Sequence, residues 1–333
     1  MGLDEGSQKP HDQLAEWLAD DMAAVNLLIR DRMASKHAPR IPEVTAHLVE
    51  AGGKRLRPML TLAAARIFGY TGPFHVHLAA TVEFIHTATL LHDDVVDESA
   101  RRRGRPTANL LWDNKSSVLV GDYLFSRSFQ LMVETGNLRV LDILANASAT
   151  IAEGEVLQLT AAQDLATTED IYLQVVRGKT AALFSAATEV GGIIAGAPEA
   201  QVQALFTYGD ALGVAFQIVD DLLDYGGTDK DIGKNTGDDF RERKVTLPVI
   251  RAVANASPEE HAFWVRVIEQ GDQQPGDLDQ ARTIMARHGA MQSAQAEALS
   301  WAAKARAALA GLPDHPLRTM LDDLATYVVA RIS

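Results

Sequence analysis

The 333-residue chain contains no cysteine, no long hydrophobic run and no surplus of basic residues. The absence of cysteine excludes disulfides, thiolate nucleophiles and cysteine metal sites, and the composition fits a cytoplasmic protein. No stretch approaches the roughly 18 consecutive apolar residues of a membrane-spanning helix, so we expect none. The net charge is −13, which argues against nucleic acid as a partner.

Hydrophobic residues make up 47% of the chain, enough for a large core. Apolar side chains recur at spacings of three and four, and strand-like alternation is weak throughout. No linker rich in serine, glycine or proline separates two halves. The sequence therefore predicts a single all-α domain over 1–333, a large helical bundle. Helices are expected over 12–35, 42–68, 75–98, 116–135, 137–164, 168–195, 199–225, 241–254, 258–270, 277–308 and 315–331.

One five-residue acidic pattern occurs twice, as Asp93-Asp94-Val95-Val96-Asp97 and as Asp220-Asp221-Leu222-Leu223-Asp224. On a helix, the three carboxylates of each copy are expected to crowd one patch of surface, where they repel one another. A hard divalent cation is the natural neutraliser, and Mg²⁺ combines one or two carboxylates with water and phosphate oxygens. Two facing clusters would hold several Mg²⁺ ions around a polyphosphate.

A solvated helix end is the other interpretation of such a pattern, and it is the usual one for a single copy in an acidic protein. Here each copy follows an apolar segment, Thr87–His92 in the first case and Gly213–Val219 in the second. Acidic surface clusters rarely emerge twice from segments that should be buried. The repetition therefore favours a metal site.

Basic residues accompany the acidic clusters. Arg101 to Arg105 follow the first cluster closely, and Lys54 and Arg57 stand behind a glycine pair. The run Arg101–Arg105 would be a solvated charge run in most proteins, but directly after three carboxylates it favours bidentate guanidinium contacts with a diphosphate. Lys54 and Arg57 form a second basic corner. Other candidates are Lys179, Thr180 and Gln217, on helices expected to face the interior, and Lys234, in a loop after the second cluster.

The helix before Asp93 presents His86, Ala88 and Thr89. Small side chains there would make an apolar shaft below a polar mouth. Ordinary close helix packing is the other interpretation of Ala88 and Thr89, and it is the usual one for such residues taken alone. His86 could be a satisfied core histidine. His92-Asp93 resembles the doublet of metal phosphohydrolases, but further histidines at suitable spacing are missing, so we interpret His92 as structural.

These motifs, in this order, resemble the trans-isoprenyl diphosphate synthases, the polyprenyl synthetase family, from about residue 25 to 330. Within the family the chain is most similar to bacterial long-chain octaprenyl, solanesyl and decaprenyl diphosphate synthases, to which Gly121–Phe125 and Ile151–Val156 contribute. The motifs are Gly52–Pro58, Leu91–Asp97, Arg102–Gly104, Gly178–Thr180, Phe216–Asp224, Gly237–Arg241 and Lys244–Pro248.

The resemblance implies an isoprenoid synthase fold around a central cavity and a role for each site residue. The catalytic, metal-binding side chains would be Asp93, Asp94, Asp97, Asp220, Asp221 and Asp224, holding about three Mg²⁺ per active site, with Mn²⁺ able to substitute. Isopentenyl diphosphate would meet Lys54, Arg57, His86 and Arg103. The allylic diphosphate, for example farnesyl diphosphate, would meet Arg102, the catalytic Lys179, Thr180, Gln217 and Lys234. Ala88 and Thr89 would set chain length.

The implied activity is head-to-tail condensation to an all-trans product of about C40 to C50, with decaprenyl favoured, for the ubiquinone side chain. The resemblance also implies a homodimer, formed through 116–135, and transient membrane contact for product release. Three alternatives remain: a shorter-chain geranylgeranyl or farnesyl diphosphate synthase, a class I terpene cyclase, and a non-catalytic synthase subunit. A cyclase needs no second diphosphate site, and inactive subunits have damaged aspartate motifs.

Overall fold

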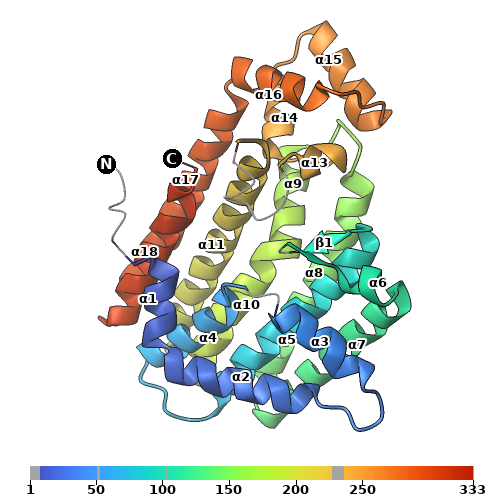
Figure 1. Cartoon of the computed structure of the whole chain (residues 1–333). Helices are drawn as coiled ribbons and strands as arrows, with labels where there is room; N and C mark the ends of the chain where they lie inside the picture. Colours follow the sequence, from blue (N-terminus) through green and yellow to red (C-terminus); the bar gives the residue numbers. More distant parts are fainter. Residues whose placement is uncertain (1–7, 51–52, 103, 227–235, 333) are drawn as a thin grey trace. The chain divides into compact units, whose positions relative to one another are not determined.

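The computed structural model describes residues 8–50, 53–102, 104–226 and 236–332 (Figure 1). Within these ranges the all-α prediction is confirmed, since the strands are limited to the short hairpin β1 (Arg101–Arg102) and β2 (Arg105–Pro106). Contacts divide the chain into two compact units. Unit 1 comprises Met1–Ser148, Leu183–Gly209 and Ala308–Leu324, and unit 2 comprises Ala149–Ala182, Asp210–Ala307 and Ala325–Ser333. The single-domain assignment stays a prediction.

Unit 1 is organised around the long helix α5, which contacts α2, α4 and α7. Leu78, Phe84 and Ile85 of α5 are fully buried, as expected for a helix that is apolar almost all round. The elements lying wholly in this unit are α1 (Pro10–Trp17), α2 (Ala19–Met33), α3 (Arg40–Glu50), α4 (Leu56–Ile67), α5 (Phe74–Val96), the hairpin, α6 (Ala108–Leu111) and α7 (Asn114–Glu134).

Unit 2 has its own apolar core, centred on Trp264, Val267 and Met285. Tyr225 and Phe240 join it from the region of the second acidic motif. The elements wholly in this unit are α9 (Glu169–Val176), the π-helical turn η1 (Arg177–Ala181), α13 (Asp238–Arg241), α14 (Leu247–Ala254), α15 (Pro258–Trp264), the π-helical turn η2 (Val265–Glu269) and α16 (Asp277–Arg287).

The remaining helices contribute residues to both units. They are α8 (Leu138–Ala161), α10 (Ala182–Ile194), α11 (Glu199–Gly226), α17 (Ala290–Ala308) and α18 (Pro316–Ala330), with the 3₁₀ turn η3 (Leu309–Gly311) between the last two. Among the described residues, α11 is the one helix whose length and composition would suit a membrane span, and 61% of its most apolar window is buried inside the structure. Core helices pass the same test, so this is weak evidence for a span.

Several predicted helices differ in extent. The one expected over 12–35 is divided at Leu18 into α1 and α2. The one expected over 42–68 is two, because residues 53–55 are not helical and Arg55 adopts a left-handed φ of 48°. The one expected over 277–308 breaks at Gly289, whose φ is 61°. A left-handed residue ends an α-helix, and glycine takes that conformation without a steric penalty. The helix expected from 241 begins only at Leu247.

Candidate functional site

The first acidic motif lies at the end of α5, where Asp97 is the C-cap. Asp93 and Asp97 are half-buried, whereas Asp94 is fully buried. The expectation of one shared patch is therefore wrong for Asp94. Its Oδ1 accepts from Nε and Nη2 of Arg102 at 2.9 and 2.8 Å. Burial raises the pKa of Asp94 above its ordinary value, and the Arg102 contacts offset only part of that effect.

Arg102 belongs to the hairpin, in which it pairs with Arg105. The Thr107 hydroxyl donates to the Ser99 carbonyl oxygen at 2.7 Å, which fastens the base of the hairpin to the chain leaving α5. Arg102, within the basic run, thus contacts the first acidic motif, as its proximity in sequence suggested. Arg103 lies outside the described residues.

The Lys54–Arg57 corner spans the start of α4, with Arg57 in its first turn. Arg55, in its left-handed conformation, forms an ion pair with the buried Glu83 of α5. The Arg57 guanidinium donates to Nε2 of His86 at 3.3 Å and lies over the Phe184 ring, 4.5 Å from its centroid. The structure therefore brings Arg57 and His86 together, while Lys54 is exposed.

The residues expected to set chain length occupy the turn of α5 before Asp93. Ala88 is fully buried, and the half-buried Thr89 donates its hydroxyl to the His86 carbonyl oxygen at 2.8 Å. His92, interpreted as structural, has Nε2 3.1 Å from the Val118 carbonyl oxygen of α7. Both contacts are explained by helix packing alone. The assignment of Ala88 and Thr89 to chain length therefore stays a prediction.

The second acidic motif lies near the end of α11, in unit 2. Asp220 is half-buried, whereas Asp221 is 5% exposed and Asp224 is fully buried. Asp224 accepts from the backbone N–H groups of Asp238 and Asp239 at 3.2 and 3.0 Å. This carboxylate therefore binds the first turn of α13, where the orphan N–H groups of a helix favour a negative charge.

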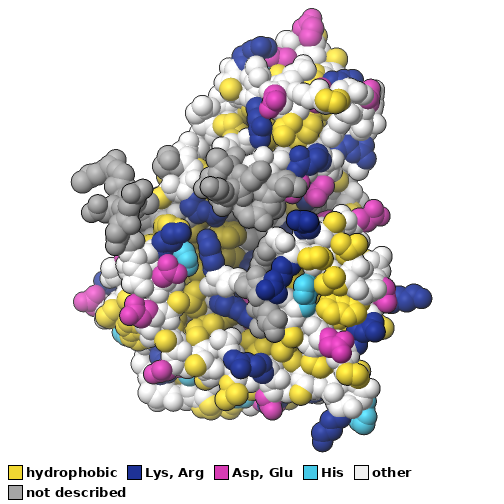
Figure 2. Space-filling model, viewed as in Figure 1, with side chains coloured by type: hydrophobic (Ala, Val, Ile, Leu, Met, Phe, Trp, Pro, Cys, Tyr) yellow, Lys and Arg dark blue, Asp and Glu magenta, His cyan; other side chains and the backbone are white. Residues whose placement is uncertain are grey.

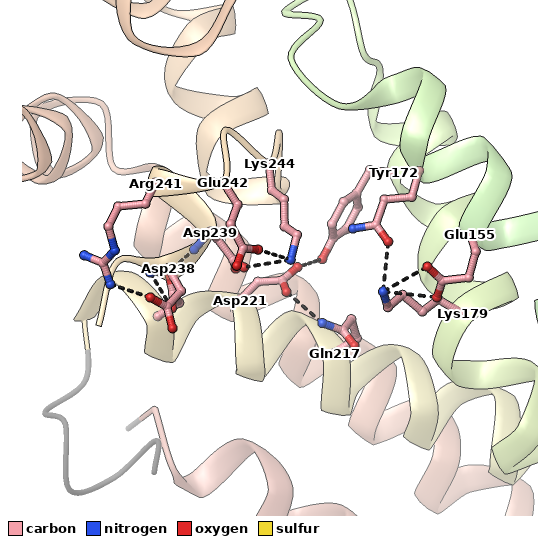
Figure 3. A network of polar contacts seen from close by, with 12 residues as sticks. Glu155, Tyr172, Lys179, Gln217, Asp221, Asp238, Asp239, Arg241, Glu242 and Lys244 are labelled. Atoms are coloured by element: carbon pink, nitrogen blue, oxygen red, sulfur yellow. Dashed lines mark hydrogen bonds and ion pairs between the residues drawn. The ribbon is translucent and has the colours of Figure 1, made fainter. Parts of the chain in front are cut away.

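Asp221 lies between two side-chain donors, as Figure 3 shows. The Tyr172 hydroxyl donates to Oδ2 at 2.6 Å and the Gln217 amide donates to Oδ1 at 2.8 Å. The Gln217 carbonyl oxygen in turn accepts from the Thr180 hydroxyl at 2.7 Å. Burial, followed by the Asp221 charge, raises the pKa of Tyr172 well above its ordinary value, so the hydroxyl keeps the proton that it donates.

Lys179 belongs to the π-helical turn η1, which interrupts the helix predicted over 168–195. Its ammonium contacts Oε1 and Oε2 of Glu155 at 3.0 and 3.1 Å and Oε1 of Gln158 at 3.0 Å. A Cβ on Gly178 would lie 2.7 Å from the Gly154 Cα, so η1 and α8 touch through their backbones. π-Helical turns frequently occur at functional sites.

Three side chains of this network were missed by sequence reasoning: Glu155, Gln158 and Tyr172. Glu155 lies inside the stretch Ile151–Val156, which was noted only as a family trait. Helical spacing would have found Gln158, which stands at i+3 from Glu155. No local spacing points to Tyr172, whose partner Asp221 is 49 residues away. Lys234 lies outside the described residues.

Within the part of the chain that the structure describes, no group of three or more histidine, aspartate or glutamate side chains is arranged to hold a metal ion by itself. Each motif instead offers one or two half-exposed carboxylates, Asp93 and Asp97 in unit 1 and Asp220 in unit 2. This is the donor set that Mg²⁺ uses when phosphate oxygens and water complete its octahedron. The side chains fit a metal that binds together with a phosphorylated ligand.

Known proteins resemble the chain over nearly its whole length. Octaprenyl diphosphate synthase from Escherichia coli (strain K12) is 45% identical over 320 residues, 96% of this chain and 98% of that protein. A crystal structure of a decaprenyl diphosphate synthase from Rhodobacter capsulatus is 78% identical, with a TM-score of 0.95 over 97% of this chain and 100% of that one. A polyprenyl synthase from Caulobacter crescentus, complexed with calcium and isoprenyl diphosphate, is 49% identical, with a TM-score of 0.93 over 100% of both chains.

These structures have the all-α isoprenoid synthase fold, which confirms the fold expected from the motifs. A family model described as polyprenyl synthetase matches residues 38–285, a range that includes both acidic motifs. The chain belongs to the polyprenyl synthetase family.

Proposed function

We propose that the chain is a metal-dependent prenyltransferase that adds isopentenyl diphosphate head-to-tail to an allylic diphosphate and makes an all-trans product of about C40 to C50. The observation that carries the proposal is the 78% identity to a decaprenyl diphosphate synthase, together with two intact aspartate motifs. The octaprenyl synthase is less similar, at 45%. Decaprenyl diphosphate, for the side chain of ubiquinone, is therefore our preferred product.

Members of the family depend on a divalent metal, and one relative was crystallised with calcium and isoprenyl diphosphate. In this chain we assign Asp93, Asp97 and Asp220 as the carboxylates that would hold about three Mg²⁺ ions, because they are the half-exposed members of their motifs. When bound, the metal would stabilise the charge on the departing diphosphate. The buried Asp94 would hold the hairpin through Arg102, while the buried Asp221 and Asp224 would hold α9 and α13.

Isopentenyl diphosphate would bind to Lys54, Arg57, His86 and Arg103, and the allylic diphosphate to Arg102, Lys179, Thr180, Gln217 and Lys234. The Arg57 guanidinium, held by His86 and by the Phe184 ring, is oriented before substrate arrives. The Lys179 ammonium is held by Glu155 and Gln158, and it would turn from them toward the more highly charged diphosphate.

The reaction requires no protein nucleophile. Ionisation of the allylic carbon–oxygen bond yields a carbocation, which the apolar side chains of the shaft protect from water. The alkene of isopentenyl diphosphate attacks the cation, and a proton leaves to the departed diphosphate. Ala88 and Thr89 would let the growing tail pass, because neither side chain is bulky.

The test of this function is turnover by the purified protein with isopentenyl and farnesyl diphosphates in Mg²⁺ or Mn²⁺, with the product identified by mass spectrometry. We expect a diphosphate of about C40 to C50. A product of C15 to C20 would favour the shorter-chain alternative, a cyclic hydrocarbon without use of isopentenyl diphosphate would favour a cyclase, and no turnover would favour a non-catalytic subunit.

The proposed assembly is a homodimer formed through α7. Leu119, Phe129 and Val133 are exposed on one face of that helix, and Leu110 and Leu111 of α6 are exposed as well. Figure 2 shows apolar side chains gathering on the surface over α6. Burying such a face against a second copy stabilises a dimer. We also propose a cytoplasmic enzyme that touches a membrane transiently, because its product is a long apolar tail.

A further inference from the structure

Four side chains in unit 2 form a continuous chain of hydrogen bonds across α9, α11 and η1. From one end to the other they are Tyr172, Asp221, Gln217 and Thr180, with donor–acceptor distances of 2.6, 2.8 and 2.7 Å. Figure 3 shows the first two of these bonds, with the Tyr172 hydroxyl and the Gln217 amide both donating to Asp221. Tyr172 and Asp221 are both buried. A buried polar group that loses its hydrogen bond destabilises the protein more than an exposed one does.

The chemistry of the members fixes the direction of every bond. An ionised carboxylate only accepts, so the Gln217 side chain must turn its NH₂ group toward Asp221 and its oxygen toward the Thr180 hydroxyl. One N–H of that NH₂ group donates to Asp221. The second N–H and the lone pairs of Thr180 are then the groups that this segment offers to a ligand.

We propose that Tyr172 is a positioning residue, whose hydroxyl fixes Asp221 and, through it, the Gln217 amide that meets the allylic diphosphate beside Asp220. This inference rests on the proposed function. Tyr172 would not touch substrate or metal itself. Loss of its hydroxyl removes the 2.6 Å hydrogen bond to Asp221, so the acceptor of the Gln217 amide is held less firmly. Removing such an outer partner typically weakens metal binding or activity about 10- to 100-fold.

The test compares Tyr172→Phe with Tyr208→Phe. Tyr208 is the matched control because it is fully buried and donates its hydroxyl to the Leu321 backbone carbonyl oxygen at 2.8 Å, in unit 1. Both variants lose one buried hydroxyl and keep the aromatic ring. The thermal unfolding midpoint is measured while Mg²⁺ is titrated in the presence of inorganic pyrophosphate, so binding is followed without turnover.

We expect the Mg²⁺ concentration that gives half of the thermal stabilisation to rise about tenfold in Tyr172→Phe and to stay at the wild-type value in Tyr208→Phe. In kinetics, the KM for farnesyl diphosphate should rise in Tyr172→Phe while the KM for isopentenyl diphosphate stays unchanged. Equal Mg²⁺ midpoints in the two variants would overturn the proposal.

If Tyr172→Phe does not fold, Gln217→Leu removes another side-chain donor to Asp221. The proposal then requires the same rise in the Mg²⁺ midpoint, and an unshifted midpoint would overturn it. Turnover by the wild-type protein distinguishes a failure of this inference from a failure of the proposed function. If it fails to elongate farnesyl diphosphate, the proposed function fails, whereas the pyrophosphate titration still decides the role of Tyr172.

Discussion

At the scale of single residues, identical aspartates in one motif have different surroundings. Asp220 is half-buried, and four residues later Asp224 is fully buried and bonded to two backbone N–H groups. The first motif repeats this contrast between Asp93 and Asp94. Spacing alone identifies a carboxylate cluster, but only the packing around it separates a side chain that can reach a ligand from one that binds a neighbouring helix or hairpin.

This contrast predicts opposite effects for two substitutions. Asp220→Ala should lower kcat about a hundredfold or more and leave stability near wild type, because it removes a repelling, half-exposed charge. Asp224→Ala should lower the free energy of unfolding by about 1–3 kcal/mol, because buried N–H groups at the start of α13 lose their acceptor. Steady-state kinetics and urea unfolding measure the two effects. Normal turnover in folded Asp220→Ala would contradict its assignment as a metal ligand.

At the scale of elements, the close contact between η1 and α8 positions Lys179, which lies in η1. A Cβ at Gly178 would lie 2.7 Å from the Gly154 Cα and 3.0 Å from the Thr150 carbonyl oxygen, so two backbones would have to separate. Gly178→Ala should therefore lower both stability and the affinity for the allylic diphosphate. Gly311→Ala is the control, since a Cβ there meets nothing within 4 Å. Calorimetry measures the loss of stability, and the KM for farnesyl diphosphate measures the loss of affinity. A wild-type KM in Gly178→Ala would contradict the predicted loss of affinity.

The environment of Glu260, in the first turn of α15, predicts that the stability of the protein depends on pH. The Ser257 backbone N–H, the His288 ring and Arg287 hold the pKa of Glu260 at about 2, below its ordinary 4.5. A carboxyl group whose pKa is depressed on folding stabilises the fold above pH 4.5, and that stabilisation is lost as the pH falls toward 2. Glu260→Gln should thus lower the thermal midpoint at pH 7 but match wild type near pH 2. An equal difference at both pH values would refute the linkage.

Local patterns predicted the helices well and the contacts between distant residues poorly. Helix α5 was expected over 75–98 and runs Phe74–Val96, because its apolar sequence ends at a carboxylate cluster. The break at Arg55 was missed, since its left-handed backbone is held by an ion pair with Glu83, on another helix. Tyr172 was missed for the same reason, because its partner Asp221 is far away in sequence.

At the scale of the whole molecule, the proposed dimer requires the exposed apolar face of α7 for its assembly. At ~100° per residue, Leu119, Phe129 and Val133 fall on one side of the helix. Light scattering should give the mass of a dimer for the wild type and of a monomer for the double variant Leu119→Glu/Val133→Glu. Leu27→Glu, on α2, is the control, because that side chain is 68% exposed and should leave the dimer intact. A monomeric wild type at micromolar concentration would exclude the assembly.

Product length is also a property of the whole molecule, because the proposed mechanism has the tail extend along α5 away from the proposed metal ligands. Each turn before Asp93 lies ~5 Å deeper, and Ala88 occupies the first of these levels. Ala88→Phe should place a ring across the shaft and shorten the product to about C15 to C20 while the metal chemistry continues. Since Ala88 is fully buried, the extra volume will also cost about 1–3 kcal/mol of stability, so folding is checked by circular dichroism.

Ala88→Ser is the control, because it keeps the small size and should keep the wild-type product. Mass spectrometry of the products decides: if Ala88→Phe folds, turns over and still makes the wild-type length, Ala88 serves only helix packing and the shaft lies elsewhere.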